Sequence, residues 1–201
     1  SFCKYCEEAY KAKKWAFVSD YARFWILHNQ GGLYFDTDVE VIKPLDEVIA
    51  KGPFMGCEKD YDPITQMGPL VAPGLGLAAE QGLPLYRDIL DLYGRIHFIK
   101  EDGSQNLDNV VFHTTQYLEK KGLEKKDGIQ CIEGIWIYPR EFFCPMDHIS
   151  QKIEITENTL SIHHYMASWL PASERFKHTV QRIVGPKATN AIVWFKSQLR
   201  K

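Results

Sequence analysis

The sequence lacks several features that would assign it to a particular class of protein. No apolar run approaches the roughly 18 residues that a membrane-spanning helix requires, and there is no internal repeat or low-complexity tract. A net charge of −2 at pH 7 gives no basic surplus of the kind that nucleic-acid-binding proteins carry. There is also no Asn-x-Ser/Thr glycosylation acceptor, which disfavours a secretory lumen. These absences favour a globular protein that has no nucleic-acid partner.

Paired cysteines are nearly absent as well. The five cysteines are an odd number, and only Cys3 and Cys6 lie close together in the sequence. Without a second pair or nearby histidines, this Cys-x-x-Cys is interpreted as incidental and not as a zinc or redox site. Reduced thiols then predict a cytoplasmic location.

What the sequence does contain is the material for one sizeable core. The 201 residues are 45% hydrophobic and 25% charged, as in ordinary globular domains. Helices and strands alternate along the chain, which predicts an α/β sandwich. The Gly- and Pro-dense stretch 51–84 predicts mobile or irregular loops. Hydrophobic periodicity predicts helices at 7–29, 46–50, 85–98 and 109–121, strands at 33–38 (extended by 39–42) and 129–138, and a hairpin of 153–155 with 160–164.

The most informative pattern is a pair of carboxylates directly after an apolar run. Asp36 and Asp38 follow Leu33-Tyr34-Phe35. In an extended strand, positions i and i+2 project from the same side. Two such oxygen ligands fill only part of the shell of Mg²⁺ or Mn²⁺, leaving room for phosphate oxygens. The pattern therefore indicates a metal site for a nucleoside diphosphate, although Asp-x-Asp alone is too short to be specific.

A second pair of charged residues lies in the preceding predicted helix. Asp20 and Arg23 are spaced i,i+3 and so neighbour each other on one helix face. One interpretation is a surface ion pair that contributes roughly a few tenths of a kcal/mol. The other is a clamp in which the carboxylate accepts from sugar hydroxyls and the guanidinium donates to them.

Two adjacent histidines close a predicted strand near the other end of the chain. His163 and His164 point to opposite faces of that strand, so only one of them can face a given site. A neutral imidazole can complete a Mn²⁺ shell that carboxylates begin. The alternative is a histidine satisfied by hydrogen bonds at the end of a strand.

The last segment, 173–201, carries seven basic residues and one acidic residue among apolar ones. Two interpretations of this basic amphipathic tail stand open. It docks on an anionic membrane surface as a peripheral contact, or it packs on the core as a solvated last helix.

Three motifs together resemble family 32 of the glycosyltransferases: Ser19–Arg23, Gly31–Val39 and His163-His164-Tyr165 with Ser168-Trp169. The likeness is to the bacterial capsular and surface-polysaccharide branch, related to yeast initiating mannosyltransferases, and it runs in order along nearly the whole chain. It implies a GT-A fold over residues 1–172, followed by the tail. Such folds begin with a strand–helix unit, whereas this sequence opens inside or just before a helix. We therefore expect that first unit to be missing.

The resemblance also implies an activity, namely a retaining transfer of a hexose from a nucleotide sugar with Mn²⁺ or Mg²⁺ as cofactor. A UDP-sugar is favoured over GDP-mannose as donor, and the acceptor is a glycan or a lipid-linked oligosaccharide. Asp20, Arg23, Asp36 and Asp38 form the expected catalytic set. The resemblance implies that Asp20, Arg23 and Tyr34 bind the donor sugar, and that Asp36 contacts the ribose or the sugar as well as the metal. Asp38 ligates the metal directly, together with His163 in preference to His164. Ser168 and Trp169 cover the diphosphate.

Two further hypotheses belong to other classes of protein. The chain could be a non-catalytic module that binds nucleotide sugars or glycans. An aspartate-nucleophile phosphohydrolase also uses a strand-end Asp-x-Asp, but it requires a downstream Gly-Asp pair, and the sequence contains none. In addition, Val39–Pro44 stands where that class has a helix. Met166-Ala167 departs from the Gly-rich stretch usual in the glycosyltransferases.

Overall fold

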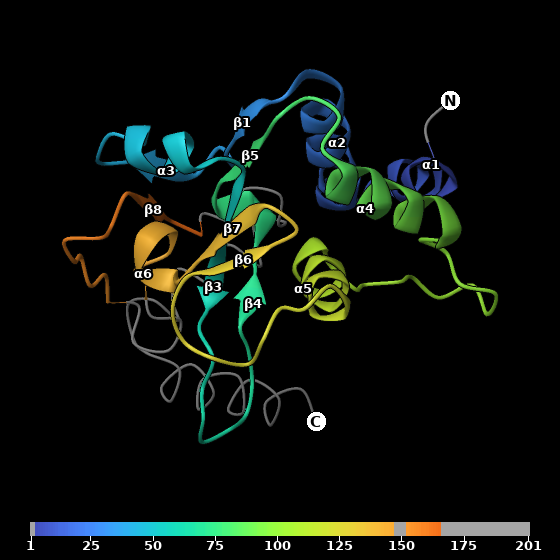
Figure 1. Cartoon of the computed structure of the whole chain (residues 1–201). Coiled ribbons are helices and arrows are strands. Elements are labelled where there is room, and N and C mark those ends of the chain that lie inside the picture. The colour runs from blue at the N-terminus through green and yellow to red at the C-terminus, as the bar shows by residue number, and fades with distance from the viewer. Residues whose placement is uncertain (1–2, 147–151, 166–201) are drawn as a thin grey trace.

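The structure is a computed structural model, and it describes residues 3–146 and 152–165. Ser168, Trp169 and the tail 173–201 lie outside the described residues, so the predictions made for them stay predictions. No helix in the described part of the chain is long and apolar enough to cross a membrane. Figure 1 shows a central sheet with helices on both sides, which agrees with the α/β class predicted from the sequence.

The central sheet has mixed strand directions. Its strands run in the order β1-β5-β3-β7-β6, and β4 also pairs with β3. The pairing of β3 with β7 is parallel, while the other pairings are antiparallel. A second, two-stranded sheet pairs β2 with β8. The strands are β1 Gly32–Tyr34, β2 Val39–Val41, β3 Phe54–Lys59, β4 Leu70–Val71, β5 Leu77–Ala79, β6 Gln130–Ile132, β7 Ile135–Tyr138 and β8 Ser161–His163.

Helices cover the two faces of this sheet unequally (Figure 1). The larger hydrophobic core contains residues of α1, α2, α4 and α5, and the smaller one contains residues of α3 and α6. A short 3₁₀ turn at Pro73–Leu75 precedes β5. The helices are α1 Lys4–Lys11, α2 Trp15–Gln30, α3 Asp46–Lys51, α4 Pro84–Arg95, α5 Val110–Lys120 and α6 Arg140–Phe143.

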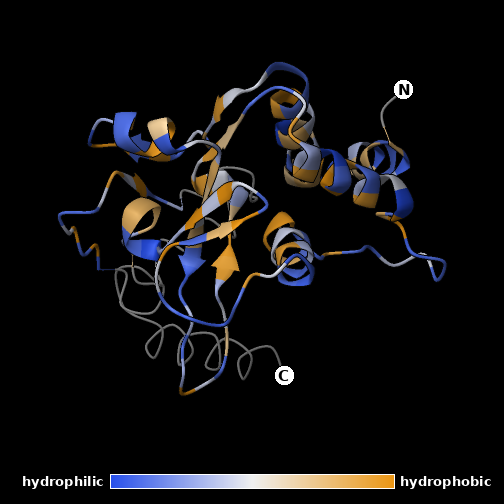
Figure 2. Ribbon diagram, viewed as in Figure 1, coloured by the Kyte–Doolittle hydropathy of each residue, from blue (hydrophilic) through white to orange (hydrophobic). Residues whose placement is uncertain are grey.

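Strand β3 contributes to both cores because its side chains alternate between faces. Met55 and Cys57 belong to the larger core, whereas Phe54 belongs to the smaller one and stacks on Phe143 at 5.2 Å. A strand buried on both faces reads as a continuous apolar run instead of an alternating one. Figure 2 shows hydrophobic residues in orange in the strands of the central sheet, while the arrowhead of β3 is blue.

The helical layer is held by edge-to-face aromatic contacts between helices. Tyr5 of α1 meets Tyr93 of α4 at 5.1 Å, and Phe24 of α2 meets Tyr86 of α4, also at 5.1 Å. All four rings are fully buried. Such pairs are worth about 0.5–1.5 kcal/mol each beyond their burial, so they hold α1 and α2 against α4.

The helix predicted at 7–29 is in fact two helices. The chain breaks after α1, where Lys13 adopts a left-handed φ of 58°. The amides of Lys13 and Lys14 donate to the carbonyls of Tyr10 and Ala9 and so close the end of α1. The hydrophobic periodicity did not reveal this break, because the residues around it are polar lysines. The consequence is a tight turn from which α2 begins at Trp15.

The prediction of mobile or irregular loops over 51–84 was wrong for three segments of that stretch. That stretch contains β3, β4 and β5, three strands of the central sheet. Its glycines serve close packing as well as turns, since a Cβ at Gly56 would lie 2.9 Å from Cδ2 of Phe143. A glycine of this kind is not a sign of a loop.

Other boundaries also differ from the predictions. The strand expected at 129–138 is a hairpin that turns at Glu133 and Gly134, both with left-handed φ. The hairpin expected between 153–155 and 160–164 does not form, because β8 pairs with β2 instead. The helices predicted at 46–50, 85–98 and 109–121 match α3, α4 and α5 to within three residues at each end, whereas α6 was not predicted.

A test of the packing around β3 is Gly56→Ala. The added methyl would lie 3.0 Å from Cβ of Phe143, which cannot rotate away, so α6 must shift. We expect the free energy of unfolding to fall by about 1–3 kcal/mol. Urea titration followed by circular dichroism measures it. The control is Gly94→Ala in α4, where nothing lies within 4 Å and stability is expected to stay or rise by up to roughly 1 kcal/mol. Equal stability of the two variants would contradict the packing assigned to Gly56.

Candidate functional site

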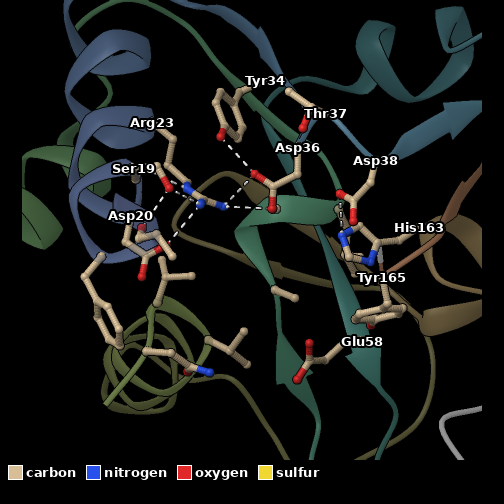
Figure 3. Close-up of a pocket in the computed structure, with 18 of the residues that line it drawn as sticks. Ser19, Asp20, Arg23, Tyr34, Asp36, Thr37, Asp38, Glu58, His163 and Tyr165 are labelled. Atoms are coloured by element: carbon tan, nitrogen blue, oxygen red, sulfur yellow. Dashed lines mark hydrogen bonds and ion pairs between the residues drawn. The ribbon is translucent and has the colours of Figure 1, made fainter. Parts of the chain in front are cut away.

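A cavity of about 830 Å³ opens between α2, the turn that joins β1 to β2, β3, the start of α5, and β8. Figure 3 shows its charged wall, with side chains from α2 on one side and from β8 on the other. The residues predicted from the sequence that line it are Asp20, Arg23, Tyr34, Asp36, Asp38 and His163. Segments more than a hundred residues apart in the sequence thus contribute to one cavity.

The centre of the charged wall is Arg23, whose side chain is only 5% exposed. Its Nη2 lies 3.0 Å from Oδ1 of Asp20, and its Nη1 lies 3.3 Å from Oδ1 of Asp36. The Asp20 side chain is 8% exposed. The pair predicted from i,i+3 spacing is therefore a buried ion pair and not a surface one. Because Arg23 also reaches Asp36, it joins helix α2 to the Asp-x-Asp segment.

Tyr34 supports the same arrangement from strand β1. Its hydroxyl donates to Oδ1 of Asp36 at 2.8 Å, and the guanidinium of Arg23 lies over its ring, 5.0 Å from the centroid. A cation over an aromatic face gains roughly 0.5–2 kcal/mol, depending on its hydration. Tyr34 thus orients both the carboxylate and the guanidinium.

The two aspartates of the motif do not lie on a strand, which corrects the prediction for 33–38. Strand β1 ends at Tyr34, and Asp36 and Asp38 fall in the turn before β2. The amide of Asp36 donates to the carbonyl of Gly74 at 2.9 Å. A Cβ at Gly74 would lie 2.0 Å from Oδ2 of Asp36. Only glycine therefore leaves room for the carboxylate in this position.

Asp36 also belongs to a second group of side chains. Asp36, Asp38 and His163 each offer a ligand atom, and these atoms all lie within 4.8 Å of one another. Nε2 of His163 is 3.2 Å from Oδ1 of Asp38 (Figure 3). Two carboxylates and an imidazole are a donor set that suits Mn²⁺ or Mg²⁺. The residues present therefore fit a divalent cation.

The pairing of β2 with β8 decides which of the two histidines faces the cavity. Val39 is directly opposite His163 in the register, so that histidine lies beside Asp38. The backbone amide of His164 donates to the carbonyl of Asp38, but its ring turns away, with Nε2 2.9 Å from Oε2 of Glu40. Adjacent strand residues point to opposite faces, as predicted.

Burial changes the ionisation of the groups around Arg23. Desolvation raises the pKa of Asp20 to about 6, although the positive charge of Arg23 acts against this rise. Burial alone would lower the pKa of Arg23, but the charges of Asp20 and Asp36 outweigh it and raise that pKa. Desolvation also raises the pKa of Tyr34 to about 12. At neutral pH the site therefore holds a charged Arg23 and an ionised Asp20.

Two residues to which the sequence assigned no role also line the cavity. Glu58, on β3, lies across the open space from Arg23 in Figure 3. The ring of Tyr165 meets that of His163 edge-to-face at 4.1 Å, and its hydroxyl contacts Sγ of Cys144 at 3.0 Å. A charge directly after an apolar run, as in Cys57-Glu58, marks the end of a buried strand. That signal could have drawn attention to Glu58.

Comparison with known proteins bears on the first part of the chain. Residues 3–55 match the family model described as the glycosyltransferase sugar-binding region containing a DXD motif. The matched segment includes Asp20, Arg23, Asp36 and Asp38. No curated protein matches the chain. The match supports a glycosyltransferase in the broad sense, a transferase that uses a nucleotide-sugar donor and an acceptor.

We predict that His163 binds metal and that His164 does not. Replacement of His163 by Ala removes one of the three clustered ligand atoms, so the dissociation constant for Mn²⁺ should rise by at least about tenfold. His164→Ala is the matched control, since that ring faces Glu40. Electron paramagnetic resonance of free Mn²⁺ measures both. Equal losses in the two variants would contradict the assignment.

The raised pKa of Asp20 predicts a specific pH dependence of stability. A folded-state pKa of about 6 exceeds the unfolded value near 4, so the folded protein holds the proton more tightly. The contribution of Asp20 to stability is then complete below about pH 4 and is lost as pH rises to about 6. Asn does not titrate. The stability of the wild type relative to Asp20→Asn should therefore fall by roughly 1–3 kcal/mol over this range.

Urea titrations of both proteins at intervals between pH 4 and pH 7 measure this difference. A difference that stays constant, or that grows with pH, would show that the Asp20 carboxyl is not held in a desolvated position.

Proposed function

We propose that this chain is a metal-dependent, retaining glycosyltransferase that moves a hexose from a nucleotide sugar to a glycan or lipid-linked acceptor. One observation carries the proposal, namely the double role of Asp36. Its carboxylate contacts Arg23 on one side and lies within 4.8 Å of the ligand atoms of Asp38 and His163 on the other. A nucleotide sugar has a diphosphate next to a hydroxyl-bearing ring, so it needs adjacent groups of these two kinds.

The sugar end of the site consists of Asp20 and Arg23. The guanidinium donates hydrogen bonds to sugar hydroxyls, and the carboxylate accepts from them. Both side chains are nearly buried yet line the cavity. Hydrogen bonds made in such a water-poor environment are stronger than those made in bulk water. The pair therefore positions the donor hexose.

The metal end consists of Asp38 and His163, with Asp36 between the two ends. These residues would hold Mn²⁺ or Mg²⁺ against the diphosphate. A bound divalent cation supplies charge stabilisation for the leaving diphosphate, worth several kcal/mol by the usual order of magnitude. Tyr34 keeps Asp36 oriented through a hydrogen bond of 2.8 Å.

The reaction exchanges one bond of the anomeric carbon for another. The bond from that carbon to the phosphate oxygen breaks, and its electron pair goes to the phosphate. The acceptor hydroxyl oxygen forms the new bond on the same face of the sugar, and its proton passes to the departing phosphate oxygen. Asp20 and Arg23 hold the ring in place during this exchange, and no nucleophile from the protein is needed.

The finer details rest on the sequence resemblance. They include membership of family 32 with its capsular and surface-polysaccharide branch, the GT-A type of fold, a UDP-sugar in preference to GDP-mannose, and a cytoplasmic location. The diphosphate contacts of Ser168 and Trp169, and the peripheral membrane contact of 173–201, are part of the same proposal.

The test is a screen of UDP- and GDP-sugars for hydrolysis in the presence and absence of Mn²⁺. We expect one donor to release its nucleoside diphosphate only with the metal, and Asp38→Asn to slow this release by at least about a hundredfold. Asp91→Asn is the control, because Asp91 makes only an exposed ion pair on α4.

Full metal-dependent activity of Asp38→Asn would contradict the assigned role of Asp38. Metal-dependent binding of nucleoside diphosphate without any turnover would instead favour a binding module. Release of phosphate from a simple phosphomonoester would favour the phosphohydrolase.

A further inference from the structure

The first turn of helix α1 carries two cysteines that take no part in the site described above. Cys3 is the N-cap residue of α1, and Cys6 lies one turn further along the helix. Their Sγ atoms lie 3.2 Å apart. From its spacing alone the pair is interpreted as incidental, because spacing does not say whether the two sulfurs meet. In the folded chain they are in contact, so the pair can react as a unit.

The two thiols differ in how easily a reagent reaches them. Cys3 is partly exposed, whereas Cys6 is only 3% exposed and belongs to the larger core. Tyr5 lies between them in the sequence and is fully buried, and its ring meets those of Tyr93 and Phe98 edge-to-face at 5.1 and 5.7 Å. These contacts fix the first turn of the helix and the two sulfurs with it. A reagent in solvent therefore reaches Cys3 before Cys6.

The surroundings of Cys3 favour its thiolate form. A hydrogen bond with Cys6 lowers the pKa of Cys3 to about 7, although burial acts against this, and backbone amides at the start of α1 lower the pKa further. The same contact raises the pKa of Cys6, as do its burial and the negative charges of Cys3 and Asp20. At neutral pH the accessible sulfur is therefore partly ionised, and the buried thiol donates to it.

We propose that Cys3 and Cys6 form a redox-active dithiol that exchanges with small disulfides of the glutathione class, Cys3 being the attacking group and Cys6 the resolving group. Such exchange requires an accessible thiolate and a second thiol within its reach. In the described part of the chain, the one cluster of three or more candidate metal ligands is Asp36, Asp38 and His163, so the cysteine pair is not part of such a cluster. The proposal is independent of the transferase function.

The first step forms a mixed disulfide. The Cys3 thiolate attacks one sulfur of oxidised glutathione, the S–S bond of that molecule breaks, and its electron pair leaves on a glutathione thiolate. Cys3 then carries no charge and accepts no strong hydrogen bond. Two of the causes that hold the proton on Cys6 are thereby removed.

The second step closes the protein disulfide. The glutathione thiolate released first accepts the proton of Cys6, and the sulfur of Cys6 attacks that of Cys3. The bond between Cys3 and glutathione breaks, and its electron pair leaves on the second glutathione thiolate. The cysteine pair is thus oxidised by two electrons, and oxidised glutathione is reduced to two molecules of glutathione.

The resulting bond is suited to exchange and not to permanent cross-linking. It joins residues one helical turn apart, so it closes a very short loop and restricts the unfolded chain little. Its Cys3 sulfur stays partly exposed, so a small thiol can attack it and reverse both steps.

The test incubates the full chain at pH 7 with mixtures of reduced and oxidised glutathione, stops the exchange with acid and maps the disulfides by mass spectrometry. We expect a bond between Cys3 and Cys6 in the wild type. Cys6→Ala should stop at the mixed disulfide of Cys3 with glutathione, because the resolving thiol is gone. Cys131→Ser is the matched control: Cys131 is exposed but lies on β6, so its loss should leave the Cys3–Cys6 bond unchanged.

A second measurement is the rate at which iodoacetamide alkylates Cys3 as a function of pH. The rate should reach half its maximum near pH 7 in the wild type, since only the thiolate reacts. Cys6→Ala removes the hydrogen bond to the thiolate, so the midpoint should rise by at least about one pH unit toward that of an ordinary cysteine. Cys131→Ser should keep the wild-type midpoint.

Three outcomes would overturn the proposal. The first is a wild type in which Cys3 stays reduced or ends as the mixed disulfide without bonding to Cys6. The second is a wild-type midpoint for Cys3 at the pH of an ordinary thiol. The third is an unchanged midpoint in a Cys6→Ala variant that circular dichroism shows to be folded. If this variant does not fold, the two wild-type measurements decide.

Discussion

The buried guanidinium of Arg23 is the constraint on which the rest of the site depends. A charge that is 95% removed from solvent is tolerated only when it is paired and hydrogen-bonded. Arg23 meets this condition by contacting Asp20 on its own helix and Asp36 on another segment. Removal of either carboxylate leaves a poorly compensated buried charge. Because Arg23 contacts both carboxylates, it holds α2 against the turn that follows β1.

The position of Asp36 then determines the geometry of the metal end. Its backbone amide bonds to Gly74, its side chain to Tyr34 and Arg23, and the turn that it begins brings Asp38 to β2. Strand β8 pairs with β2 and adds a histidine from far along the sequence. A glycine at position 74 is needed because any side chain would displace the carboxylate. The sugar end and the metal end are thus parts of one connected arrangement.

Much of the site could be predicted from the sequence because its residues lie in short local patterns. The i,i+3 spacing alone predicted that Asp20 lies next to Arg23, and the alternation of side chains along a strand predicted that one histidine turns away from the site. The choice of His163 depended on the register between β2 and β8, which no local pattern contains. Likewise, spacing could not reveal that the Asp20–Arg23 pair is buried, since Tyr34, Gly74 and Val110, which lie beside the pair, come from other parts of the chain.

The fold was less predictable where glycine and proline serve packing. The stretch 51–84 resembled loops, yet it contains the central strand β3 and with it Glu58. Trp15 was predicted to lie inside a long helix, whereas a left-handed Lys13 makes it the first residue of α2, where it meets the cavity. Contacts between distant segments outweighed the local pattern in the first case. In the second, a local turn closed by the amides of Lys13 and Lys14 ended the helix.

The most direct test of the connected site is the mutual effect of metal and nucleotide on each other's binding. Calorimetric titration of Mn²⁺ with and without a saturating nucleoside diphosphate measures it, and linkage requires the converse titration to give the same factor. The account predicts that each ligand binds at least about tenfold more tightly in the presence of the other, and that Asp38→Asn abolishes this coupling. Independent binding of the two ligands to the wild-type protein would contradict a shared site at Asp36, Asp38 and His163.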